Sequence, residues 1–144
     1  MRTPYTQLYL HLVWSTWDRH PLLTEQVQER VYDCMQAECT RLRTDVIAIG
    51  GVVDHVHILV RPPATLAPAD LVKRIKGTSS HLVNYEVRPP FFFKWQGAYG
   101  AFSVSKRHVP MMREYVLRQE ERHRDGRVHP ELEPPPSRDP EPRG

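Results

Sequence analysis

The sequence predicts an α+β fold, a ferredoxin-like and RRM-like βαββαβ antiparallel sheet with an appended C-terminal helix that carries Tyr115. Two observations support this prediction. Segments with strand character and segments with helical periodicity follow one another in the order strand, helix, strand, strand, helix, strand, helix. A short connection around Gly50-Gly51 joins the second and third strands, which favours an antiparallel hairpin. In such a fold the first and third strands are the central neighbours of the sheet.

Two strands and one helix account for the first part of the chain. Tyr5 to Ser15 is rich in aromatic and aliphatic residues and has the length of a buried strand, in which His11 is expected to be a hydrogen-bonded core histidine. Thr24 has the character of an N-cap, and apolar residues recur at helical spacing from Glu25 to Arg43. Asp45 to Ile49 is predicted to be the second strand, which the two glycines end.

The second part of the chain supplies two more strands and two more helices. Val53 to Arg61 is predicted to be the third strand, and an apolar stripe predicts a helix from Pro68 to about Glu86. Gly77 costs this helix about 1 kcal/mol relative to alanine, which indicates close approach by another backbone. Ala101 to Ser105 is a short fourth strand, and the last helix is expected from Pro110 to about His123.

Residues 1–124 are predicted to form one domain and residues 125–144 a disordered tail. The tail contains six prolines and eight charged residues, and it has almost nothing to bury. Five of those charges are acidic and three are arginines, so the tail carries a net charge of −2. The whole chain carries +3, which leaves +5 on the domain and favours a polyanionic partner.

The sequence indicates a cytoplasmic protein without a membrane partner. No apolar run approaches the roughly 20 residues that cross a bilayer, and the N-terminus lacks the apolar segment of a signal peptide. Cys34 and Cys39 lie five apart in a helical pattern and therefore on different sides of the helix. This spacing favours reduced thiols over a disulfide or a shared metal.

Two further segments offer contacts to an anion, and each has a structural alternative. The polar side of the helix from Pro68 includes Lys76, and it is either a phosphate-binding face or a solvated basic face. In the loop from Arg88 to Gly100, Phe91, Phe92, Phe93 and Trp95 lie beside Lys94. Those rings either stack on nucleic acid bases, close the edge of the core or form a subunit contact.

Two histidines begin the third strand. Because side chains alternate along a strand, His55 and His57 share one face while Val56, Ile58 and Val60 share the other. Two imidazoles side by side form half of a metal site. A chain with eight histidines can also contain such a pair by chance, so ordinary strand histidines are the alternative.

The appended helix offers groups that complete such a site. Tyr115 and Gln119 are four residues apart and lie on one helical face. A glutamine amide oxygen can be the third ligand of a divalent ion, and a tyrosine one turn away can be a nucleophile. The alternative for Tyr115 is a half-buried packing residue.

Four motifs together resemble one protein family. They are Asp54-His55-Val56-His57-Ile58-Leu59, Lys76-Gly77-Thr78-Ser79-Ser80, Gly100-Ala101-Phe102-Ser103-Val104-Ser105, and the pair Tyr115 and Gln119. Each motif alone is loose, but in this order and spacing they resemble the single-tyrosine HUH transposases. These are the small transposases of bacterial and archaeal insertion sequences and their REP-associated relatives. The likeness covers about residues 5 to 123, so residues 1–124 are expected to form an HUH transposase catalytic domain.

The resemblance implies a metal-dependent transposase that cuts and rejoins single-stranded DNA through a 5′-phosphotyrosine intermediate. His55 and His57 would be the metal-binding histidines, Gln119 the third ligand and Tyr115 the nucleophile. The family uses Mg²⁺ or Mn²⁺, whereas imidazole ligands alone favour a softer metal. Its members are typically homodimers with composite active sites, and they read a hairpin in the DNA next to the cut.

The residues also suggest where DNA binds, and they leave alternatives open. Lys76, Lys106 and Arg107 are the first candidates for contacts to the DNA backbone. The third strand is also similar to the histidine-triad nucleotide hydrolases, but Leu59 stands where that class has its nucleophilic histidine. The remaining alternative is a non-catalytic or domesticated single-stranded nucleic-acid-binding protein of the same fold.

Overall fold

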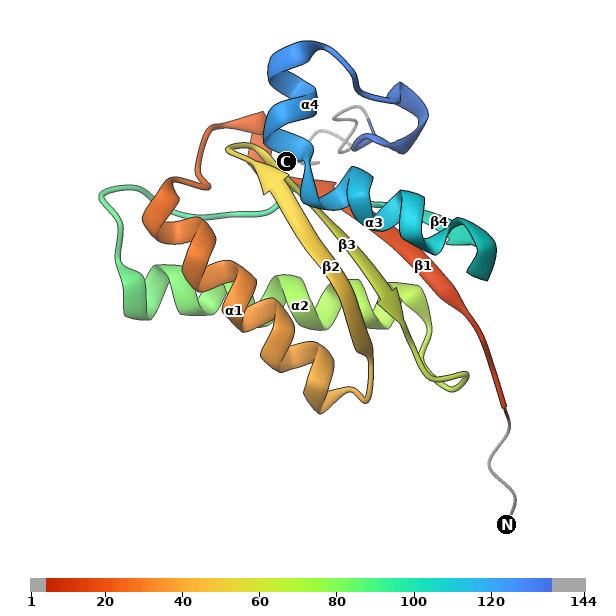
Figure 1. Cartoon of the computed structure of the whole chain (residues 1–144). Helices are drawn as coiled ribbons and strands as arrows, with labels where there is room; N and C mark the ends of the chain where they lie inside the picture. The colour runs from red at the N-terminus through yellow and green to blue at the C-terminus, as the bar shows by residue number, and fades with distance from the viewer. Residues whose placement is uncertain (1–4, 136–144) are drawn as a thin grey trace, which may run out of the picture.

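A four-stranded antiparallel sheet in the order β2-β3-β1-β4 forms the middle of the protein (Figure 1). The computed structural model describes residues 5–135. The strands are β1 (Tyr9–Ser15), β2 (Asp45–Val52), β3 (His55–Arg61) and β4 (Gly100–Val104). The helices are α1 (Glu25–Arg41), α2 (Pro68–Leu82), α3 (Val109–Leu117) and α4 (Gln119–Asp125). β1 and β3 are the central strands and the element order is βαββαβ followed by helix, so the predicted fold class is confirmed.

The hairpin of β2 and β3 is tighter than the sequence suggests. The two glycines that were expected to end β2 pair with β3 instead, Gly50 opposite His57 and Gly51 opposite Val56. β2 therefore runs to Val52, and only two residues separate it from His55. β1 also differs from its prediction, because it begins at Tyr9 rather than Tyr5.

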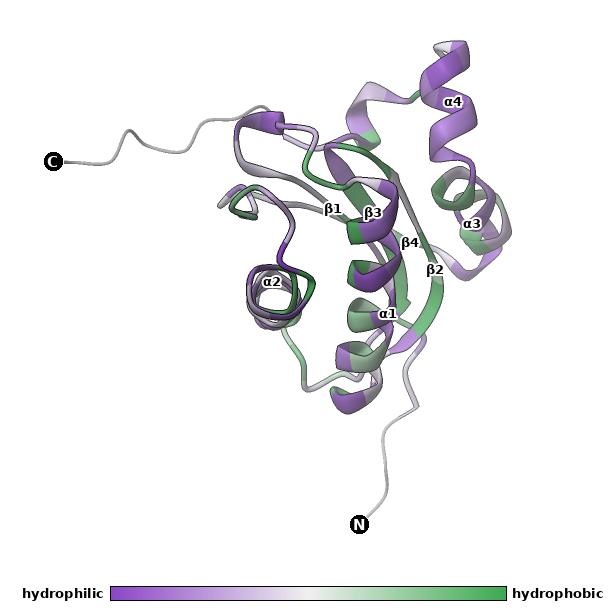
Figure 2. Ribbon diagram, turned by 90° about the vertical axis from the view of Figure 1, so that its left-hand side faces the viewer, coloured by the Kyte–Doolittle hydropathy of each residue, from purple (hydrophilic) through white to green (hydrophobic). Residues whose placement is uncertain are grey.

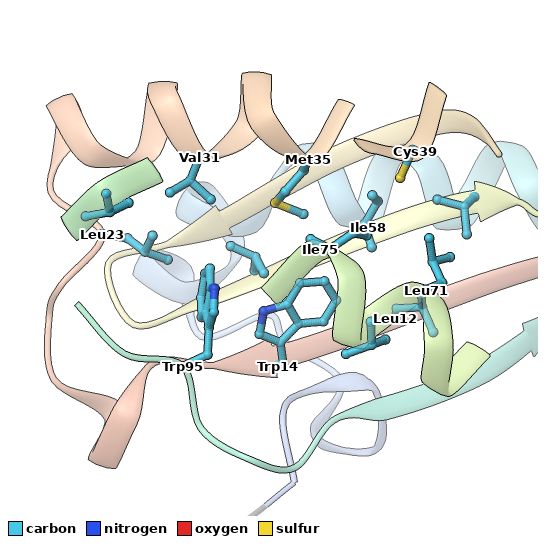
Figure 3. Packing of buried hydrophobic residues seen from close by; sticks show 14 of the residues in the cluster. Leu12, Trp14, Leu23, Val31, Met35, Cys39, Ile58, Leu71, Ile75 and Trp95 are labelled. Carbon is cyan, nitrogen blue, oxygen red and sulfur yellow. The ribbon is translucent and has the colours of Figure 1, made fainter. Parts of the chain in front are cut away.

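Helices α1 and α2 cover one face of the sheet and enclose the main hydrophobic core (Figure 2). Alternate residues of the central strands point into it, including Trp14 and Ile58, which are fully buried. Val31 and Met35 of α1 face these residues from one side, and Ile75 of α2 does so from another (Figure 3). Burial of apolar surface, at roughly 25 cal/mol per Å², is the main force that holds these layers together.

The aromatic loop after α2 closes the edge of this core. The side chains of Phe93 and Trp95 are buried, and the indole Nε1 of Trp95 donates a 2.9 Å hydrogen bond to Ser79 Oγ. The Asn84 side chain bonds both the N–H and the carbonyl of Phe93 at 2.8 Å. Phe92 is the exposed ring of the loop. For Phe93 and Trp95 the core-closing alternative is therefore the one observed.

Helix α3 lies on the opposite face of the sheet, where a second and smaller core forms beneath it (Figure 2). Tyr115 and Val116 of α3 pack there against Leu59 of β3 and Ala48 of β2. The helix crosses β2 at Gly50, where a Cβ atom would lie 1.8 Å from the carbonyl oxygen of Val116. The backbone contact leaves no space for a side chain at this position.

The last helix of the prediction is divided into two. Arg118 has φ −106° and ψ 30°, which separates α3 from α4. The side-chain Nε2 of Gln119 donates a 3.1 Å hydrogen bond to the carbonyl of Tyr115, the acceptor that the Gln119 backbone N–H would use in a continuous helix. Within residues 5–135, no helix is both long and apolar enough to cross a membrane.

Residues 125–135, the first half of the expected tail, have a defined structure. Gly126, with φ 69°, caps α4 in the left-handed conformation, and the chain then reverses. Residues 127–135, called the C-terminal segment below, return across α3 and include a short 3₁₀ turn at Pro130–Leu132. Leu132 packs against the second core. The composition did not predict this packing, because few apolar residues take part in it. Residues 136–144 of the expected tail lie outside the described residues.

The sequence assigned close backbone approach to Gly77, whereas the structure places it at Gly50. A Cβ atom at Gly77 would meet nothing within 4 Å. Gly50→Ala is therefore expected to lower the free energy of unfolding by about 2 kcal/mol or more, because overpacking forces backbone shifts. Gly77→Ala is the matched control and is expected to raise it by about 1 kcal/mol through helix propensity. Urea unfolding of both variants measures the difference, and equal effects would contradict the close packing of α3 on β2.

Candidate active site

The two histidines of β3 lie on the sheet face that α3 covers. His57 is opposite Val13 of β1 and Gly50 of β2, which places the pair near the middle of the sheet, as predicted. Both imidazoles are fully buried. Their Nε2 atoms approach the two oxygens of one carboxylate, that of Glu133, at 3.2 Å for His55 and 3.3 Å for His57.

The other ring nitrogen of each histidine has its own partner. Asp54 Oδ1 lies 2.7 Å from His55 Nδ1, and His11 Nε2 lies 2.7 Å from His57 Nδ1. Although burial opposes the shift, the hydrogen bond with His55 lowers the pKa of Asp54. Because an ionised carboxylate can only accept, His55 carries a proton on Nδ1. Such a second partner is what orients a metal-binding histidine.

Tyr115 of α3 lies beside the same carboxylate. Its hydroxyl donates a 2.7 Å hydrogen bond to Glu133 Oε2 and accepts a 3.0 Å bond from the backbone N–H of His129. The phenol ring meets His57 edge-on, with centroids 5.8 Å apart, and the Arg122 guanidinium lies 4.9 Å from the ring centroid. Burial, together with the bond to Glu133, raises the pKa of Tyr115 to about 12. The phenol is therefore protonated at neutral pH and needs an acceptor in order to attack.

Sequence reasoning missed Glu133, which it placed in a disordered tail. The C-terminal segment brings this carboxylate between the histidine pair and Tyr115. Composition did not reveal this position. The available signal was Gly126, which follows the last helix where a C-cap glycine reverses the chain.

Electrostatics keeps the carboxylate charged in this buried setting. Burial opposes ionisation, but contacts with His55, His57 and Tyr115 lower the pKa of Glu133 well below its usual range. Burial opposes the charged form of His55 as well, yet the hydrogen bond with Asp54 and the nearby Glu133 carboxylate raise its pKa. Burial lowers the pKa of His57. The pKa of His11, which burial and the neighbouring His57 depress, falls to about 3, so His11 is neutral.

Gln119 lies near the site but faces a different partner. It is buried at the start of α4, and its Oε1 lies 3.0 Å from His123 Nε2. His123 in turn contacts Glu133 Oε1 at 2.6 Å. His123 was not among the predicted site residues, although its spacing of four from Gln119 and eight from Tyr115 places it on the same helical face.

The three predicted DNA contacts lie in two different settings. The Lys76 ammonium donates hydrogen bonds to the carbonyls of Gln96 at 2.6 Å and Ala98 at 3.1 Å, so it holds the aromatic loop to α2. Lys106 and Arg107 are exposed in the short turn that precedes α3. The structure therefore leaves two of the three cations directed to solvent.

The residues at the centre of the site fit a divalent cation. His55 Nε2 and His57 Nε2 are buried and make no hydrogen bond of good geometry, although Glu133 lies close to both. One atom from each of these three residues lies within 4.8 Å of the others. Neighbouring ligands of an ion with bonds of about 2.1 Å lie about 3 Å apart. The distances of 3.2 and 3.3 Å from the histidines to Glu133 are close to this value, whereas the full spread of the three ligand atoms is wider. Two imidazoles and a carboxylate accept several first-row metals as well as Mg²⁺.

The chain is similar to transposases along most of its length. The family model for IS200-like transposases matches residues 4–119. The ISDra2 transposase TnpA of Deinococcus radiodurans is 26% identical over 122 residues, which cover 81% of this chain and 86% of that protein.

Solved structures show the same fold. One, of a protein from Deinococcus radiodurans R1 assigned as a transposase, superposes with a TM-score of 0.63 at 23% identity and covers 81% of this chain and 95% of its own. Another, a REP-associated tyrosine transposase bound to a REP hairpin, gives a TM-score of 0.62 at 13% identity, with coverage of 88% and 76%.

The matched region contains nearly all of the site. Residues 4–119 include both histidines of β3, Tyr115 and Gln119, whereas Glu133 lies beyond them. With this family match, the chain belongs to the IS200-like transposases.

Proposed function

We propose that this transposase cuts and rejoins single-stranded DNA through a 5′-phosphotyrosine link at Tyr115, with Mg²⁺ or Mn²⁺ as cofactor. One observation carries the proposal. The Tyr115 hydroxyl and the Nε2 atoms of His55 and His57 all contact the carboxylate of Glu133, at 2.7, 3.2 and 3.3 Å. A nucleophile and a metal half-site that share one small anionic group can also share a phosphate.

His55 and His57 are the proposed metal ligands, and an oxygen atom completes the set. The family resemblance assigns that oxygen to Gln119, but the position of Glu133 favours the carboxylate. A bound divalent ion would polarise the scissile phosphate and neutralise charge that develops on it. Oxygen ligands suit Mg²⁺ and Mn²⁺, and the preference for these ions over softer ones rests on the family.

In the proposed reaction, Tyr115 Oη attacks the phosphorus and its proton passes to solvent. Glu133 Oε2, which accepts the hydrogen bond of this hydroxyl, orients the phenol. The bond from phosphorus to the 3′ oxygen breaks, and that oxygen leaves as a hydroxyl group after it takes a proton from solvent. A second 3′-hydroxyl can later attack the phosphotyrosine link and regenerate Tyr115. Strands are exchanged in this way without ATP.

The proposed substrate is single-stranded DNA with a hairpin at the element end. This proposal draws support from the solved REP-associated relative, which is bound to a REP hairpin. The exposed cations Lys106 and Arg107 are proposed to contact the DNA backbone. Lys76 is proposed as a third contact, and it also holds the aromatic loop in place. The cell compartment proposed for this activity is the cytoplasm.

The proposed assembly is a homodimer with composite active sites, in which one subunit supplies Tyr115 to the histidine pair of the other. A single chain also places its own Tyr115 beside its own His57, with ring centroids 5.8 Å apart. Within the single chain, the position of α3 is set by the helix break at Arg118 and by its backbone contact with Gly50 of β2. The choice between the two arrangements is open to a direct test.

The first test is a covalent adduct. Purified protein with Mn²⁺ and single-stranded DNA from the flanks of its own gene is expected to yield a DNA–protein band that resists denaturation. Tyr115→Phe removes the attacking oxygen and is expected to abolish the band, and chelation with EDTA should do the same. Tyr99→Phe is the control and should leave the band intact. A band that survives Tyr115→Phe would refute this nucleophile, and DNA binding without any adduct would favour the non-catalytic alternative.

The second test identifies the third metal ligand. Glu133→Ala is expected to weaken Mn²⁺ binding at least about 10- to 100-fold, the loss typical even of outer partners of a metal site. Gln119→Ala is expected to change the affinity much less, because its Oε1 faces His123. Isothermal titration of each variant with Mn²⁺ measures both constants. The opposite ranking would return the third position to Gln119.

The third test asks which subunit supplies the tyrosine. Tyr115→Phe and His57→Ala are each expected to be inactive alone. If the sites are composite, every heterodimer has one complete site. Heterodimers make up about half of the dimers in an equimolar mixture, so adduct formation is expected to return to a measurable fraction of wild type. A mixture that stays inactive, although light scattering shows dimers, would mean that Tyr115 acts on the histidine pair of its own chain.

A further inference from the structure

His57 of the proposed metal site shares a hydrogen bond with His11, a buried histidine of the neighbouring strand that was not among the predicted site residues. His11 Nε2 lies 2.7 Å from His57 Nδ1, and the two rings are nearly coplanar, at 16°, with centroids 5.0 Å apart. A short distance between ring nitrogens in nearly coplanar rings indicates rings that meet edge to edge. The register of β1 and β3, with His11 opposite Leu59 and Val13 opposite His57, holds them as diagonal neighbours.

The protons in this pair can be arranged in only two ways. A hydrogen bond between ring nitrogens requires one nitrogen to carry the proton and the other to be bare. If His11 donates, His57 Nδ1 is bare, and the proton of a neutral His57 sits on Nε2, the atom that faces Glu133. If His57 donates from Nδ1, its Nε2 is bare and its lone pair points toward the proposed metal position.

We propose that His11 is a positioning residue that accepts the Nδ1 proton of His57 and so keeps His57 Nε2 free to bind the metal. The inference rests on the proposed function, because it concerns the same metal site. His11 does not touch the metal or the DNA in this account. It acts through His57, as Asp54 acts through His55.

The residues around His11 agree with a role as the hydrogen-bond acceptor of His57. Its side chain is fully buried, and the other rings near it, Phe102 and Tyr115, meet it at 5.7 and 6.4 Å between centroids. The two positioning groups differ in charge for a physical reason. Asp54 sits in the β2–β3 turn with its side chain one-quarter exposed, whereas a carboxylate in mid-sheet at position 11 would lose all contact with water. A neutral imidazole accepts the proton without that cost.

This arrangement places the one proton of His11 on Nδ1. That atom is buried and has no hydrogen-bond partner among residues 5–135. The contacts of His11 itself therefore do not favour the tautomer with a proton on Nδ1. A metal at His57 Nε2 would favour it, because His57 then carries its proton on Nδ1 and donates it to His11 Nε2. The tautomer of His11 in the metal-bound protein is thus a direct readout of the proposed role.

Two substitutions separate hydrogen bonding from packing. His11→Phe fills the space but offers no acceptor, so the Nδ1–H of His57 would be buried without a partner. We expect it to weaken Mn²⁺ binding about 10- to 100-fold. The midpoint of thermal unfolding without metal is expected to change little, because the proton of His57 can then sit on Nε2, which faces Glu133. His11→Gln offers an amide oxygen and is expected to keep the affinity within about threefold of wild type.

Leu12→Val is the matched control. Leu12 is the next residue of β1, fully buried, and its side chain lies in the main core on the other face of the sheet. This variant is expected to lower thermal stability without changing Mn²⁺ affinity. Equal loss of affinity in Leu12→Val and His11→Phe would mean that packing of β1 matters and not the hydrogen bond, which would overturn the proposal. His11→Phe that binds as wild type, or His11→Gln that loses as much as His11→Phe, would overturn it as well.

A measurement on the unmodified protein covers the case in which a variant fails to fold. Nitrogen-15 NMR of the histidine rings, with Zn²⁺ as a diamagnetic probe, is expected to show His57 and His11 both protonated on Nδ1 and bare on Nε2. A proton on His11 Nε2 would overturn the proposal while leaving the metal site intact. If the wild type binds neither Mn²⁺ nor Zn²⁺, the proposed metal site fails first and this inference fails with it.

Discussion

The antiparallel pairing of β3 with β1 is the contact on which both the core and the site depend. Val13 lies opposite His57, and His11 lies one diagonal away. Since side chains alternate along each strand, this register sends Ile58 into the main core and His57 to the opposite face. A shift of one residue in this register would place the histidines in the core and apolar residues in the site. The same strand pairing therefore determines both the core and the site.

The second layer of the site depends on how closely α3 approaches the sheet. Backbone contact at Gly50 brings the helix down onto β2, and Tyr115 then reaches the level of the histidines. The chain reverses at Gly126, and the C-terminal segment adds Glu133 from above. Two glycines, one without space for a side chain and one in the left-handed conformation, thus position a phenol and a carboxylate that lie on different elements.

A polar cluster in this place is costly for the fold. Three fully buried histidines and an ionised Glu133 lie next to the apolar residues of the second core. Buried charges of this kind rarely add net stability, because desolvation offsets the attraction between them. A buried cluster of titratable groups with shifted pKa values agrees with a part in chemistry rather than in folding.

The sequence by itself determined the order of the elements, the shared face of His55 and His57, and the place of Tyr115 on the last helix, because alternation and helical periodicity are local properties. Family resemblance added the reaction. Only the tertiary structure decided which distant groups meet. His11 reaches His57 across 46 positions, and Glu133 reaches Tyr115 across 18. Strand register and a chain reversal create those contacts, and neither produces a periodic pattern in the sequence. The contacts of His11 and Glu133 with the predicted site residues were therefore found only in the structure.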